Sequence, residues 1–152
     1  MSHRIAVQCT LSFPPGPVAP IAAVEIAGGG VIAATRSQPI WTGFAVAGEP
    51  VTASTMLGVG LVNANRSWDA HGYDVETLGD GKGSIQGEWT ESGSASGSSI
   101  QWRIRSGSGV AAGIDGHATI SCGPPGPDGS ITCQLSGSYT LPPPASVGGP
   151  DT

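Results

Sequence analysis

Short runs of alternating apolar and polar residues, separated by Gly and Pro, restrict the fold of this chain more than any other feature. Residues 5–11 alternate cleanly, and residues 84–90 and 100–105 repeat the pattern. Only residues 56–65 would admit a short helix, because apolar positions spaced by three and four are absent elsewhere. Alternate residues of a strand point to opposite faces, so each run can bury one face. The pattern predicts an all-β protein.

The composition agrees with this prediction. Of 152 residues, 25 are Gly and 13 are Pro, and 11% are charged, against about 25% in ordinary globular chains. The length suits one domain. We therefore predict a single all-β domain over residues 1–141, either an antiparallel β-sandwich of jelly-roll or immunoglobulin-like type or a closed barrel. Residues 142–152 begin with three prolines and are predicted to form an extended, disordered C-terminal arm.

The second half of the chain predicts the clearest strand pairing. Residues 84–90 and 100–105 should pair antiparallel, with the Ser- and Gly-rich residues 91–99 as a flexible loop between them. Two further strands, within residues 110–122 and 130–141, follow after short turns. The sequence thus predicts a meander of four strands at the end of the domain.

Two of the three cysteines flank a predicted turn. Residues 126–129 read Gly-Pro-Asp-Gly, which favours a tight turn with Pro at its second position. With that turn as the centre of a hairpin, Cys122 lies opposite Cys133 and Ile120 opposite Leu135. Opposed cysteines in such a hairpin are close enough for a disulfide, and two small buried thiols would give the same pattern.

Two Asp-x-His pairs are the sharpest candidates for chemistry. Asp69 and His71 form one pair, and Asp115 and His117 form the other. Residues two apart in a strand share a face, so each pair could offer a carboxylate and an imidazole to a divalent ion. The alternative interpretation is that all four are ordinary turn residues. No other cofactor is predicted.

A second candidate site combines aromatic and amide side chains. Trp68 lies in a polar stretch shortly before Tyr73, and Asn63 and Asn65 precede it. An exposed aromatic ring with polar neighbours is a common way to stack a sugar ring. The alternative is a buried indole whose N–H bonds to the backbone.

Charge and hydropathy argue against two classes of partner, nucleic acid and the membrane interior. The net charge is −5, and the six Lys and Arg residues are scattered, which argues against nucleic acid. No apolar stretch is long enough for a membrane span, and no secretory signal is visible at the N-terminus. We therefore expect synthesis in the cytoplasm, with later incorporation into a particle as one outcome.

No catalytic motif was found, so the sequence does not predict an enzyme. The first functional hypothesis is a structural or assembly subunit of virion or appendage type, such as a decoration, spike or tail accessory protein. Such a subunit would bind other protein subunits and form homo-oligomers. The alternatives are a carbohydrate-binding module that uses Trp68 and Tyr73, and a small metal-binding protein or enzyme that uses the Asp-x-His pairs.

Overall fold

The computed structural model of the protein describes residues 3–15 and 20–143. These residues form strands and turns with no helix, so the all-β prediction is confirmed. A helix long and apolar enough to cross a membrane is absent from the same residues. Most of the predicted C-terminal arm, residues 144–152, lies outside the described residues. The strands are β1 (Arg4–Phe13), β2 (Ala22–Ile26), β3 (Gly30–Ser37), β4 (Ile40–Thr42), β5 (Ala45–Val46), β6 (Glu49–Val62), β7 (Trp68–Leu78), β8 (Gly83–Ser94), β9 (Gly97–Gly109), β10 (Asp115–Cys122) and β11 (Ile131–Thr140).

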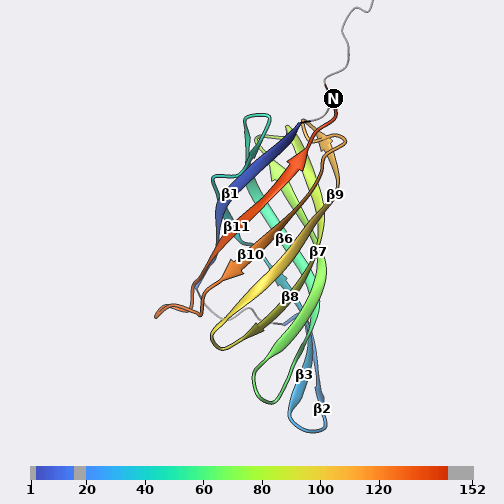
Figure 1. The fold of residues 1–152 in the computed structure, drawn as a ribbon. Coiled ribbons are helices and arrows are strands. Elements are labelled where there is room, and N and C mark those ends of the chain that lie inside the picture. Colours follow the sequence, from blue (N-terminus) through green and yellow to red (C-terminus); the bar gives the residue numbers. More distant parts are fainter. Residues whose placement is uncertain (1–2, 16–19, 144–152) are drawn as a thin grey trace, which may run out of the picture.

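All the strands belong to one antiparallel sheet that curls around a single interior (Figure 1). The order is β2-β3-β6-β7-β8-β9-β10-β11-β1-β4, and β5 pairs with β6 beside this path. The predicted meander of four strands is present as β8 to β11, and β6 and β7 extend it. The sheet does not close, because β2 ends it on one side and β4 on the other. The fold is therefore sandwich-like, made from one curled sheet, and the closed barrel is not formed.

The hairpin between β10 and β11 has the predicted register. Ile120 pairs with Leu135 and Cys122 with Cys133. The N–H of Gly129 donates to the carbonyl of Gly126 at 2.9 Å, which closes the turn at the expected residues. Cys122 and Cys133 are joined by a disulfide.

One local prediction was wrong. Residues 91–99 are not a flexible loop, because β8 continues to Ser94 and β9 begins at Gly97. Residues 56–65, the one segment that would have admitted a short helix, form none, since β6 runs through them to Val62. In both places a neighbouring strand supplies the backbone hydrogen bonds, so pairing in the sheet outweighs the local preference of the residues.

Inward-facing glycines leave room for the large rings of the interior. A Cβ atom at Gly58 would overlap the ring of Trp89, and one at Gly87 would overlap the indole nitrogen of Trp102. Gly58 lies on β6, two strands away from Trp89 on β8, and Gly87 lies on β8, next to the β9 strand that carries Trp102. The absence of a side chain there allows the indoles to lie flat against the sheet and fill the interior.

One end of the curled sheet, which we call the packed end, is filled by aromatic rings. The centroid of the Trp41 ring is 5.3 Å from that of Trp102 and 5.4 Å from that of Phe44. Tyr139 lies 6.0 Å from Phe44 and donates a hydrogen bond of 3.2 Å to the carbonyl of Ala45. These spacings are typical of packed aromatic pairs. The short strands β4 and β5 bring Trp41 and Phe44 across this end, since β4 pairs with β1 and β5 with β6.

Candidate functional site

The opposite end, which we call the open end, contains a cavity of about 390 Å³. Its volume lies within the range of small-molecule sites. Small side chains, such as those of Ala33 and Ala70, face inward here. The wall is therefore mainly apolar, but its side chains are too small to fill the space that it encloses. The residues that shape the cavity are Phe13, Ala33, Gly60, Trp68, Trp89 and Ser98.

Among the residues that the structure describes, Glu91 is the only ionisable side chain that lines this cavity. It follows Trp89 by two residues on β8, so both side chains face inward. The indole of Trp68 reaches it from β7, lying over Gly93, where a Cβ would overlap the ring. Burial raises the pKa of Glu91, and hydrogen bonds from Ser98 and Trp68 oppose that rise. Glu91 was not among the predicted site residues, because residues 91–99 were expected to form a loop. In a strand, its spacing of two from Trp89 would have placed it on the inner face.

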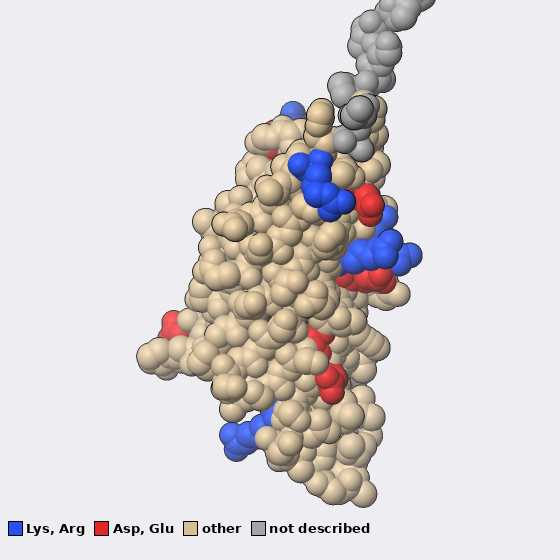
Figure 2. All heavy atoms as spheres, viewed as in Figure 1, with Lys and Arg blue, Asp and Glu red and all other residues tan. Residues whose placement is uncertain are grey.

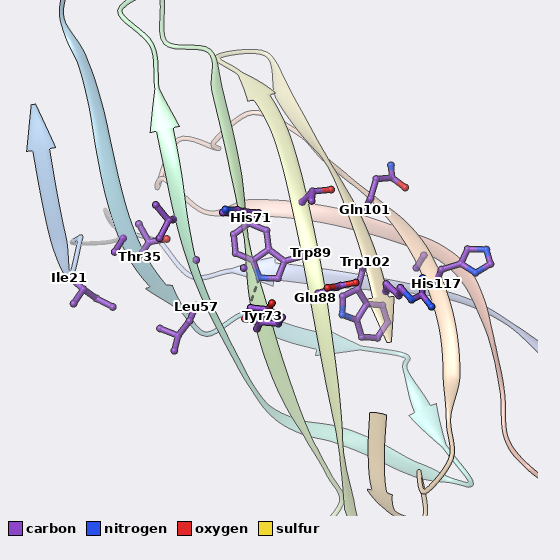
Figure 3. A pocket seen from close by; sticks show the side chains of 17 residues that line it. Ile21, Thr35, Leu57, His71, Tyr73, Glu88, Trp89, Gln101, Trp102 and His117 are labelled. Atoms are coloured by element: carbon purple, nitrogen blue, oxygen red, sulfur yellow. Dashed lines mark hydrogen bonds between the residues drawn. The ribbon is translucent and has the colours of Figure 1, made fainter. Parts of the chain in front are cut away.

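A second hollow, a groove of about 770 Å³, crosses the strands from β3 to β10. Figure 3 shows its side chains as a row that includes Leu57 on β6, Tyr73 on β7, Glu88 on β8 and His117 on β10. The indole N–H of Trp89 donates to the carbonyl of Tyr73 at 3.3 Å beneath this row. Most of the lining side chains point outward, so the groove is part of the surface of the molecule.

An apolar surface adjoins the groove. Strands β2, β3, β6 and β7 carry exposed apolar side chains on their outer side, and neighbouring strands place them in register. Leu57 stands opposite Tyr73, for example, and Val24 opposite Ile32. Exposed fractions reach 63% for Val24 and 69% for Tyr73. We call this surface the apolar face; its members are Val24, Ile32, Leu57, Val59, Leu61, Tyr73 and Val75.

The residues of the predicted carbohydrate site do not share a surface. Trp68 faces the interior cavity, whereas Tyr73 is exposed on the outer side of β7. The side-chain amide of Asn63 donates to the Ser67 hydroxyl at 3.0 Å, and the side-chain Oδ1 of Asn65 accepts from the Ser67 backbone N–H at 3.0 Å. Both amides therefore hold the β6–β7 turn. The odd spacing of five between Trp68 and Tyr73 already implies opposite faces in a strand.

The two Asp-x-His pairs lie on different strands. Asp69 and His71 are on β7, Asp115 and His117 are on β10, and β8 and β9 separate them. His71 and His117 both line the groove. Asp69 instead accepts a hydrogen bond of 2.8 Å from Ser92. Among the described residues, no three His, Cys, Asp or Glu side chains gather in an arrangement that could hold a metal ion.

A pair of buried acids lies in the interior, away from both hollows. Trp102 donates to Asp74 Oδ2 at 2.8 Å, and Ser54 donates to Glu76 Oε2 at 2.9 Å. Burial is the main cause that raises the pKa of Asp74 and, to a greater extent, that of Glu76. The second carboxyl oxygens, Asp74 Oδ1 and Glu76 Oε1, have no hydrogen-bond partner outside the pair. A side-chain hydrogen bond joins the two acids to each other. One proton shared between the acids would satisfy both oxygens.

Comparison of the chain with protein-family models, with curated proteins and with solved structures finds no match.

Proposed function

We propose that this protein is a non-enzymatic assembly subunit, such as a decoration, spike or tail accessory protein, that binds other copies of itself. The apolar face carries the proposal. Soluble monomers rarely expose contiguous apolar patches larger than about a few hundred Å². Patches above that size mark interaction surfaces. Charged side chains are also sparse in Figure 2, where most of the visible surface is uncharged. Such a surface offers little selectivity for an oppositely charged partner.

The edge of the sheet supports the same proposal. β2 is the last strand on its side of the sheet, and all five of its residues are exposed. It contains neither Pro nor Lys, which are common means of preventing edge pairing, and Glu25 is its only charged residue. An edge of this kind is a template for another strand, and it adjoins the apolar face at Val24.

A second copy of the chain is the occupant that fits this geometry. Val24 is the middle residue of β2. Antiparallel pairing of two β2 strands about a twofold axis would therefore bring the two Val24 side chains close to that axis. The two apolar faces would then become continuous, and each copy would offer the same surface to the other, as in most homodimers.

The test is the native mass by light scattering over a roughly hundredfold dilution. We expect a mass that is a multiple of 15.1 kDa, the mass of one chain. Val24→Lys should reduce it to a single chain, since a charge would be placed at the twofold axis. Ile40→Lys is the matched control, because Ile40 is 59% exposed on β4, the opposite edge.

A wild-type protein that stays a single chain at every concentration would contradict the proposal. Dissociation by Ile40→Lys but not by Val24→Lys would contradict the assigned surface. The carbohydrate alternative has less support, because Trp68 and Tyr73 face opposite sides of β7. The metal alternative has less support because two strands separate the Asp-x-His pairs.

A further inference from the structure

The cavity at the open end is distinct from the apolar face. Its lining side chains come from the inner side of the sheet, whereas the apolar face belongs to the outer side of β2, β3, β6 and β7. The proposed self-assembly therefore does not use the cavity. A hollow of about 390 Å³ with a mainly apolar wall, in which Thr35, Ser37, Ser94 and Ser98 place hydroxyl groups and Glu91 a carboxyl group, has the composition of a small-molecule site.

Within residues 3–15 and 20–143, the carboxyl group of Glu91 has no cationic partner. The one ion pair there joins Arg105 to Glu88, at 3.1 Å, and Glu88 points to the outer side of the same strand. Lys and Arg are absent from the part of the cavity lining that these residues form. A carboxylate withdrawn from water without a counter-charge is costly, so it favours a ligand that brings a positive charge.

Aromatic rings flank this carboxyl group. Trp89 lies on the same strand two residues before it, and Trp68 reaches it from β7. Both indoles line the cavity. The face of an indole attracts organic cations, most strongly where water is excluded. A carboxylate between two tryptophans therefore combines the two kinds of group that recognise an ammonium ion.

We propose that the open-end cavity binds a small organic ammonium compound, with its apolar body against the hydrophobic wall and its cationic head between Trp68, Trp89 and Glu91. The cavity is too small for a folded partner, and its apolar wall disfavours a sugar or a free anion. Glu91 supplies the charge selectivity, and the two indoles supply affinity for the head group.

The experiment measures binding of benzyltrimethylammonium by tryptophan fluorescence, together with neopentylbenzene, its uncharged carbon isostere, and benzenesulfonate, an anion of similar size. We expect the cation to bind about tenfold more tightly than the isostere. Glu91→Gln should remove that preference. Glu88→Gln, which removes a carboxylate from the outer side of the same strand, should keep it.

Equal affinity for the cation and the isostere, a preference for the anion, or no saturable binding of the cation would each overturn the proposal. The isostere comparison uses the wild-type protein, so it holds even if Glu91→Gln fails to fold. Val24→Lys separates the two proposals, because a dissociated chain with an intact cavity should still bind the cation.

Discussion

The packed end and the open end of the curled sheet are built on the same alternation of inward and outward side chains, yet one is filled and the other is hollow. At the packed end, Phe44 and Trp41 are carried across the opening by β4 and β5 and meet Trp102. At the open end, Ala33 and Gly60 occupy the corresponding inner positions. Alternation therefore decides which side chains face inward, and their volumes decide whether the interior is filled.

The largest expected difference comes from removing one tryptophan at each end. Trp102→Ala should cost about 3–5 kcal/mol of unfolding free energy, because it opens a cavity and removes the indole N–H that donates to Asp74. Trp68→Ala should cost about 1–2 kcal/mol, since its ring already borders a cavity. Urea unfolding of both variants measures the difference. Equal losses would show that the two ends are packed alike.

The reverse test enlarges a small residue at each end. Ala118 is 4% exposed, and even a Cβ added at Gly137 would overlap the Ala118 Cβ, so Ala118→Leu should cost about 1–3 kcal/mol. Ala33 faces the cavity, so Ala33→Leu should change stability by less than about 0.5 kcal/mol. It should also reduce cation binding by filling the site. A large loss from Ala33→Leu in urea unfolding would indicate that the open end has no spare volume.

A further comparison places a methyl group on a glycine. In Gly87→Ala the new Cβ would overlap the Trp102 indole nitrogen and lie 2.8 Å from the Asp74 oxygens. We expect a loss of about 1–2 kcal/mol, measured by thermal or urea unfolding. Gly123→Ala is the control at the open end, where the nearest atom would be 4.0 Å away. Similar stabilities of the two variants would argue against close packing of Trp102 on β8.

The last difference concerns the dependence of stability on pH. Burial raises the pKa of Glu76 above its value in the unfolded chain, so the folded protein retains a proton that the unfolded chain releases. Stability should therefore fall as the pH rises from about 4.5 through the raised pKa. Among the described residues, Asp74 is the only other ionisable group that is hydrogen-bonded to Glu76.

Glu76→Gln should flatten this pH dependence, because the amide can donate to Asp74 and accept from Ser54 without ionising. Unfolding midpoints between pH 4 and pH 8 measure the effect. Glu91→Gln serves as the comparison from the open end and should flatten the profile less, since the pKa of Glu76 is raised further. An unchanged slope in Glu76→Gln would mean that the acid pair does not control the pH response.

Sequence reasoning was most successful where alternation and a turn signal coincided. The Gly-Pro-Asp-Gly turn at residues 126–129 set the register of β10 and β11, including the facing of Cys122 and Cys133. It failed where composition suggested a loop, because residues 91–94 gain their strand conformation from β7. That failure concealed Glu91, the residue on which the ammonium site depends.

The sequence by itself determined that the chain is all-β, that its second half is a meander, and which side of the strands within residues 84–90 and 100–105 faces inward. These properties are local, since they follow from alternation over a few residues and from turns that join neighbouring strands. Only the tertiary structure decided the curl of the sheet, its unpaired edges at β2 and β4, and the placement of Glu91 between two tryptophans. Those features depend on pairings such as β1 with β11, between residues more than a hundred positions apart, for which the sequence carries no local signal.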